Sequence, residues 1–317
     1  MFTSEKTELS NPVTLNLMNL PHSIGIAFVI AILSLSSSSF ARTWTSVDGR
    51  TLEADLVEYD AGAETVKIKR KDGQEFTLKK NTLSEADIAH LDALEAERLA
   101  ALKAAAAKAK TLAGATTSHV SGGDHKVPFH VYFPKGYDGS KKLPMLILFS
   151  PGGGGKGILN PFKEPADKMG WVLVGCDKFK NGMDSDLGDA MFAELLPEIE
   201  ETVEHDSEYL YLGGFSGGAM RSFDYSARFE RPWKGIVACG GWLGGPENSD
   251  QKYAEKMAVA IVNGVDDKAA NSWIDRDTDV LKKHRCKVEV FECPGGHVIA
   301  PPEILLKAMK WIEEEQE

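Results

Sequence analysis

The sequence predicts an α/β fold whose main domain is a doubly wound, mostly parallel sheet, and three observations lead to it. Several short runs in the last two thirds of the chain are apolar on both faces, as in buried parallel strands. Helical patterns separate these runs. A serine between glycines, Gly214-Phe215-Ser216-Gly217-Gly218, lies where one such run gives way to a helical pattern. The expected strands begin at Phe129, Pro144, Trp171, Tyr209, Gly235, Met257 and Lys287, and the clearest expected helices cover residues 189–203, 219–229 and 302–315.

The first 41 residues resemble an export signal. A short apolar run over residues 24–35 precedes four serines, and Ser39 and Ala41 are small residues of the kind that signal peptidase prefers. The run is too short for a comfortable membrane span. We expect residues 1–41 to be a cleaved signal peptide and the protein to be secreted or periplasmic. The alternative is an N-terminal segment that stays as a membrane anchor.

Residues 42–83 alternate apolar and polar side chains with period two, which indicates short strands. Asp48-Gly49 and Asp72-Gly73 are hairpin signals between them. Four short strands in about forty residues predict a small SH3-like β domain.

This segment resembles the Sla-type homology domain, which is also found in exported planctomycete and verrucomicrobial proteins. The residues that carry the resemblance are Arg42, Trp44, Asp48-Gly49-Arg50, Ala54, Val66, Asp72-Gly73, Phe76 and the closing run over residues 83–87. The resemblance implies a module that binds a protein or peptide ligand.

Residues 84–113 form the next expected element, a helical linker. Ser84 is a helix N-cap and Asp87 occupies the third position of a capping box. The sequence that follows is rich in alanine, leucine, glutamate and lysine, which favour helix. Its second half has little to bury, so we expect a semi-rigid spacer. The main domain then spans residues 114–317.

The serine at position 216 fits the pattern G-x-S-x-G between a strand and a helix, the setting of a nucleophile elbow. Such a turn lifts the serine clear of the sheet and places it at a helix N-terminus, where the partial positive charge favours an oxyanion. The sequence therefore predicts Ser216 as a nucleophile.

A serine nucleophile needs a base, and His297 is the candidate among eight histidines. It follows the last expected strand in a glycine-rich loop, "CPGGHVIAPPE". The other seven fit less well. His22, His90 and His119 are expected outside the sheet, His125 before its first strand, His130 inside a strand, and His205 and His284 in solvent near helix ends.

The acid that orients the base is expected after the preceding strand, in "VNGVDDKAA". Asp266 and Asp267 both qualify, and Asp267 is the preferred candidate, although either could instead cap the next helix. The chain order Ser, Asp, His is the one this topology requires.

The oxyanion hole is predicted from backbone N–H groups. Gly217 supplies one, and Gly152 and Gly153, in the run "FSPGGGGKG", supply the second. Gly157 follows Lys156 where a phosphate-binding loop would have serine or threonine, which argues against such a loop. Phe215 and Trp242 are the candidates for the substrate pocket.

These motifs together resemble the α/β-hydrolase superfamily, and within it the dienelactone hydrolases and the polyhydroxybutyrate depolymerase and feruloyl esterase group. The resemblance covers residues 114–317. The sequence departs from the family pattern at Ser150-Pro151, which replaces the usual His-Gly before the oxyanion loop. The resemblance implies a Ser216–His297–Asp267 triad and no cofactor or metal.

Composition narrows the function further. The net charge of −11 argues against non-specific nucleic-acid binding. The four cysteines contain no C-x-x-C pair and are expected as buried thiols. The sequence thus predicts a secreted serine hydrolase that cleaves small or polymer-linked carboxylic esters through an acyl-enzyme. A serine peptidase on the same fold and a catalytically inactive surface protein-binding module are the alternatives.

Overall fold

The computed structural model describes residues 42–316. The expected signal peptide or anchor, residues 1–41, lies outside the described residues. Within the described part, no helix has the length and apolar character needed to cross a membrane.

The N-terminal strands form a four-stranded antiparallel sheet in the order β1-β2-β3-β4. Their bounds are Arg42–Thr45, Thr51–Asp60, Thr65–Lys69 and Glu75–Lys79. A short 3-10 turn, η1 (Lys80–Thr82), follows β4. The alternation seen in the sequence puts Trp44, Ala54, Val66 and Ile68 into one small core.

Helix α1 (Glu85–Leu112) begins at the expected cap, where the Ser84 side chain accepts the N–H of Asp87. The buried Asp87 carboxylate binds the Arg42 side chain at 2.9 Å and the N–H of Thr45 at 2.7 Å. The helix start is therefore fastened to the small sheet. Most of the later helix is exposed, since its alanines and lysines have nothing to cover.

The main domain has an eight-stranded sheet in the order β12-β11-β10-β9-β7-β8-β6-β5. Six neighbouring strands, β12 to β8, are parallel, and the pairs β8–β6 and β6–β5 are antiparallel. The bounds are β5 Thr116–Val120, β6 Pro128–Tyr132, β7 Leu143–Phe149, β8 Val172–Cys176, β9 His205–Phe215, β10 Trp233–Cys239, β11 Ala258–Gly264 and β12 Lys287–Cys293.

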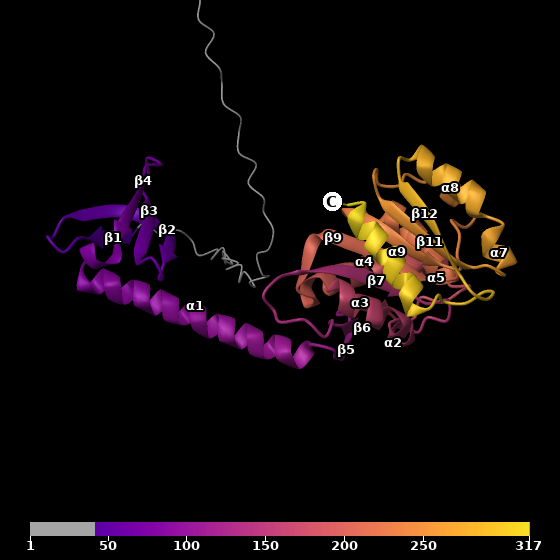
Figure 1. The fold of residues 1–317 in the computed structure, drawn as a ribbon, viewed down its shortest axis with the longest axis horizontal. Coiled ribbons are helices and arrows are strands. Elements are labelled where there is room, and N and C mark those ends of the chain that lie inside the picture. The colour runs from indigo at the N-terminus through magenta and orange to yellow at the C-terminus, as the bar shows by residue number, and fades with distance from the viewer. Residues whose placement is uncertain (1–41, 317) are drawn as a thin grey trace, which may run out of the picture. The chain divides into compact units, whose positions relative to one another are not determined.

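Helices cover both faces of this sheet, as the double winding predicts (Figure 1). One face carries α4 (Ser185–Thr202), α5 (Gly217–Arg228) and α8 (Ile274–Lys283). The other face carries α2 (Gly155–Ile158), η2 (Asn160–Phe162), α3 (Lys163–Met169) and α9 (Pro302–Glu314). Two short helices, α6 (Pro246–Ser249) and α7 (Lys268–Asn271), lie in loops.

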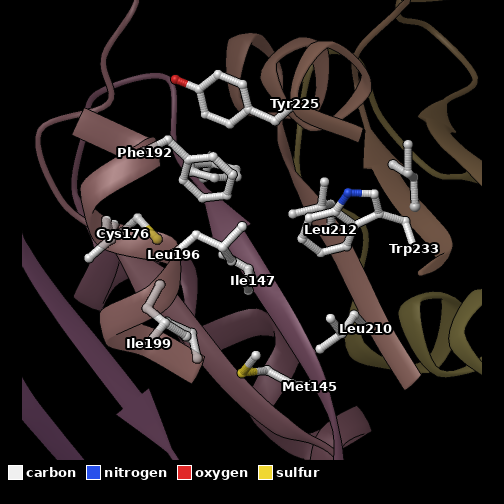
Figure 2. Packing of buried hydrophobic residues seen from close by; sticks show 14 of the residues in the cluster. Met145, Ile147, Cys176, Phe192, Leu196, Ile199, Leu210, Leu212, Tyr225 and Trp233 are labelled. Carbon is white, nitrogen blue, oxygen red and sulfur yellow. The ribbon is translucent and has the colours of Figure 1, made fainter. Parts of the chain in front are cut away.

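Alternate residues of β7 supply both cores. Met145, Ile147 and Phe149 pack toward α4, while Leu146 and Leu148 pack toward the α9 side. Figure 2 shows the first core, with Phe192, Leu196 and Ile199 of α4 among residues of the central strands. A strand buried on both faces in this way reads as a continuous apolar run, which is why the sequence signal was strong.

Two histidine expectations were wrong. His119 was expected outside the sheet but lies in β5, the antiparallel edge strand, whose short polar sequence hid its period. His205 was expected in solvent but is buried as the first residue of β9, where its Nδ1 is 2.7 Å from the carbonyl oxygen of Val203.

The four cysteines are buried free thiols in this structure. Burial raises the pKa of Cys239 to about 12 and that of Cys286 to about 11, because the thiolate is poorly solvated there. Neither thiol is therefore suited to act as a nucleophile near neutral pH.

Candidate active site

Ser216 occupies the sharp turn between β9 and α5. Its φ is 56° and its ψ is −122°, a backbone conformation that a non-glycine residue rarely adopts. The turn is held by its neighbours, because the Ser216 N–H donates to the carbonyl of Cys239 at 2.8 Å and its own carbonyl accepts the N–H of Ala219 at 2.9 Å. This is the strained strand–turn–helix geometry expected of a nucleophile elbow.

The glycines on either side of Ser216 are required by close backbone approach. A Cβ added to Gly214 would lie 2.4 Å from the carbonyl oxygen of Phe149, and one added to Gly218 would lie 2.1 Å from the same oxygen. Strand β7 therefore passes directly against the elbow. Only glycine at both positions lets β9 and α5 meet this strand.

His297 lies in the loop after β12 and faces Ser216. Its Nε2 is 2.9 Å from Ser216 Oγ, and its Nδ1 is 2.6 Å from Asp267 Oδ2. The imidazole packs against the ring of Phe215, with centroids 4.8 Å apart. Gly240 lies beneath it, and an added Cβ would come within 3.3 Å of the imidazole. Along the chain, His297 is 30 residues from Asp267 and 81 residues from Ser216, and the structure brings the three side chains together.

Asp267, the preferred acid, contacts the imidazole, whereas the side chain of Asp266 is exposed. Asp267 is buried and has a second role: its Oδ1 accepts the N–H of Ala270 at 3.1 Å and caps α7. The capping and the histidine contact, which the sequence offered as alternatives, are made by two oxygens of one carboxylate. The cap fixes the carboxylate and leaves Oδ2 for the histidine.

The loops that carry Asp267 and His297 are joined by backbone hydrogen bonds. The N–H of Asp266 donates to the carbonyl of Gly295 at 2.9 Å. A Cβ on Gly264 would lie 2.1 Å from the carbonyl oxygen of Gly296, so the two loops touch backbone to backbone. This contact sets the distance between the acid and the base.

The candidate oxyanion donors differ from the prediction in one respect. Gly217 is the first residue of α5, so its N–H has no acceptor within the helix. Among residues 42–316, the N–H of Gly152 donates to Ser150 Oγ at 3.4 Å, a long hydrogen bond. The N–H of Gly153 donates to the carbonyl of Ser150 at 3.0 Å in a turn where Gly153 has a φ of 71°. Gly153 was therefore wrongly predicted as a donor, because the turn already uses its N–H.

A cavity of about 700 Å³ opens beside the elbow. Ser216 and Gly217 line it, whereas His297 does not. Of the two residues predicted for the substrate pocket, Trp242 lines this cavity and Phe215 does not. Phe215 lies between the imidazole and the core on the α9 side, and its assignment to the substrate pocket stays a prediction.

The loop that carries Trp242 is hydrogen-bonded to a buried acid of α8. Asp277 of α8 accepts the N–H of Leu243 at 2.8 Å, and Arg276 binds the same carboxylate. Burial raises the pKa of Asp277, although these partners oppose the shift. The Trp242 ring stacks on Trp273 at 6.5 Å, which gives the rim of the cavity an aromatic side.

Most residues that line the cavity were not identified from the sequence, and two of them lie close to the oxyanion donor Gly217. Asn181 lies over Gly217: a Cβ at position 217 would fall 1.8 Å from Asn181 Oδ1. Arg221 lines the cavity from α5. No pattern marks Asn181, which sits in a loop, but Arg221 follows Gly217 by four residues and so shares its helix face. That spacing was a usable signal.

Within residues 42–316, no group of three or more histidine, cysteine or acidic side chains is arranged to hold a metal ion.

The sequence matches no protein-family model and no curated protein. Solved structures do resemble it. Est1E from Butyrivibrio proteoclasticus has a TM-score of 0.50 at 14% identity, covering 63% of this chain and 98% of its own. The structure of DcsB with its substrate analogue has a TM-score of 0.50 at 14% identity, covering 63% and 99%. A ferulic acid esterase has a TM-score of 0.48 at 15% identity, covering 63% and 97%.

At these identities the likeness concerns the fold. The shared 63% corresponds in size to the main domain, and the mixed, mostly parallel sheet with helices on both faces is the α/β-hydrolase fold.

Proposed function

We propose that this chain is a serine hydrolase that cleaves carboxylic esters through an acyl-enzyme. The observation that carries the proposal is the continuous contact from Ser216 Oγ through His297 to the buried Asp267. A serine hydroxyl becomes an effective nucleophile when a base within hydrogen-bond reach accepts its proton and a third group orients that base.

The reaction proceeds in two halves. Ser216 Oγ attacks the ester carbonyl carbon while His297 Nε2 takes its proton. The negative charge on the carbonyl oxygen is stabilised by the N–H groups of Gly217 and Gly152 and by the N-terminus of α5. The tetrahedral intermediate collapses, the C–O bond to the alcohol breaks, and His297 returns the proton to the leaving oxygen. A water molecule then attacks the acyl-enzyme in the same way: His297 takes a proton from the water, the bond between the acyl group and Ser216 Oγ breaks, and His297 returns the proton to Ser216.

The test of the nucleophile is covalent labelling. The full chain should react with a fluorophosphonate probe, and mass spectrometry of peptides should place the adduct on Ser216. A Ser216→Ala variant should remain unlabelled. Labelling at another residue would assign the nucleophile to that residue and contradict the role of Ser216. The absence of labelling in folded protein would favour the inactive surface-binding alternative.

Asp267→Asn should separate the two roles of this side chain. Asparagine is also a good N-cap, so we expect unfolding free energy to change by less than about 1 kcal/mol. The amide cannot hold the imidazole in the required tautomer, and we expect kcat to fall by about 10³- to 10⁴-fold. Thermal unfolding and ester hydrolysis measured on the same sample check this. A large loss of stability with little loss of rate would show that Asp267 is mainly a structural cap.

Ester substrates are proposed ahead of amides, and matched 4-nitrophenyl esters and 4-nitroanilides with one acyl group would decide between esterase and peptidase. A panel of feruloyl, acetyl-xylan and hydroxyalkanoate esters would then define small or polymer-linked substrates.

We also propose, from the sequence resemblance, that residues 42–83 form an SH3-like module that binds a protein or peptide ligand. We propose from the sequence alone that residues 1–41 direct export, either as a signal peptide that is cleaved or as a segment that stays as a membrane anchor.

A further inference from the structure

The cavity beside Ser216 is lined by five charged side chains, and four of them have partners. They are Asp184, Asp189, Arg221, Asp224 and Arg228. Arg228 binds both Asp189 and Asp224 in an ion-pair cluster. Asp184 accepts the N–H of Leu187 at 3.0 Å as the N-cap of α4. These four groups are therefore engaged within the protein.

Arg221 is different, because no carboxylate lies within ion-pair distance of it among residues 42–316. Its guanidinium lies over the rings of Phe179 and Tyr225, 5.7 and 5.9 Å from their centroids. Its Nη1 is buried and makes no hydrogen bond within residues 42–316, although the guanidinium also interacts with the Tyr225 hydroxyl and lowers the pKa of Tyr225 against the effect of burial. A buried cationic donor without an acceptor is unfavourable, and contact with aromatic faces compensates only in part.

The position of Arg221 relates it to the reacting group. It follows Gly217 by four residues on α5, so the two residues share one face of the helix and lie about one turn apart. An anion bound by Arg221 would thus lie one helical turn from the oxyanion donor of Gly217.

The cavity also distinguishes the two sides of an ester. The leaving oxygen must take its proton from His297, and His297 does not line the cavity. The acyl group stays bonded to Ser216, which does line it. On the proposed mechanism, we therefore expect the acyl chain to extend into the cavity toward Arg221 and the alcohol to leave on the side of the imidazole.

We propose that Arg221 anchors an anion subsite and that the preferred substrates are esters whose acyl chain ends in a carboxylate. This inference rests on the proposed function for its assignment of acyl and alcohol sides. The guanidinium fork matches a carboxylate, and the aromatic faces behind it hold the fork in place. The cavity acids Asp189 and Asp224 are both bound by Arg228, whose single positive charge offsets one of their two negative charges. Burial raises the pKa of Asp189, which favours the uncharged form of that carboxyl group, so the charge of Arg221 is the one left for a ligand.

The kinetic test uses two substrates with acyl chains of equal length, mono-4-nitrophenyl adipate and 4-nitrophenyl hexanoate. The full chain should have the higher kcat/KM for the adipate. Arg221→Met keeps the apolar stem against Phe179 and Tyr225 and removes the charge. We expect it to lower the adipate-to-hexanoate ratio about 10- to 100-fold, mainly through the KM for adipate.

Arg221→Lys is the matched control, because it keeps the charge and loses only the fork; it should retain more of the preference than Arg221→Met. Thermal unfolding of both variants checks that each is folded. An unchanged ratio in a folded Arg221→Met variant would overturn the subsite, even with full esterase activity.

A binding test separates the subsite from catalysis. In the Ser216→Ala background, monomethyl adipate should bind at least about tenfold more tightly when Arg221 is present than in Ser216→Ala/Arg221→Met, measured by titration calorimetry. Arginine-dependent binding without ester hydrolysis by the parent protein would support the subsite and contradict the proposed function. Equal binding to both variants, or binding to neither, would overturn the subsite and leave esterase activity to be judged on the neutral hexanoate.

Discussion

Ser216→Ala is expected to lower kcat for short 4-nitrophenyl esters by about 10⁴- to 10⁶-fold. The hydroxyl is the atom that bonds to the acyl group, and neither His297 nor the oxyanion donors can form an acyl-enzyme without it. Because the substitution leaves the backbone of the elbow in place, thermal unfolding should change little. Steady-state kinetics with the full chain, together with the absence of an acyl-enzyme burst, measure the effect.

Ser222→Ala is the matched control for this change. Ser222 lies on the same helix, α5, but its buried hydroxyl donates to the carbonyl of Gly218 at 3.0 Å and does not face the cavity. We expect the variant to stay active, with at most about 1 kcal/mol lost from the unfolding free energy. If Ser216→Ala retained the rate of the wild-type protein while folded, another nucleophile would have to be sought.

Gly218→Ala is expected to lower the unfolding free energy by about 3 kcal/mol or more, or to prevent folding. The added methyl group would lie 2.1 Å from the carbonyl oxygen of Phe149 and 3.1 Å from the N of Ser150. Both atoms belong to backbone at the end of β7, next to the centre of the sheet, so neither can move without disturbing the strand pairing. Chemical denaturation of the full chain measures the loss.

The matched control here is Gly157→Ala. Gly157 is exposed in α2, an added Cβ would meet nothing within 4 Å, and alanine favours helix over glycine. This variant should be as stable as the wild type or slightly more stable. If the two variants had equal unfolding midpoints, the close approach of β7 and α5 would be contradicted.

The main elements of the sheet domain were predictable because their signals are local. Helices α5 and α9 begin and end within two residues of the expected ranges, since their apolar stripes mark them. The central strands read as continuous apolar runs because both faces are buried. Strand β5 was missed because it is a polar edge strand. The burial of His205 was missed because its charged neighbours in the sequence do not show that other elements cover it.

The candidate site was predictable in its three side chains but not in its surroundings. Ser216, Asp267 and His297 each follow a strand, and the carboxyl ends of parallel strands meet at one edge of the sheet. Whether the N–H of Gly153 is free depends on a turn within its own loop, which the glycine run alone does not specify. The sequence does not show that Arg221 lacks an ion-pair partner, because that depends on Asp189 and Asp224 both pairing with Arg228 in the folded structure.

The sequence by itself therefore determined the central strands, the clearest helices and the three side chains of the candidate triad, because periodicity, glycine spacing and chain order are local signals. The tertiary structure decided which groups are free to act. Asp267 satisfies the cap of α7 and the imidazole at once, Phe215 packs behind the histidine instead of lining the cavity, and Arg221 is left without an acid. The physical reason is that donors, acceptors and charged groups form hydrogen bonds and ion pairs with partners from distant parts of the chain. Only the folded arrangement shows which of these groups remain free.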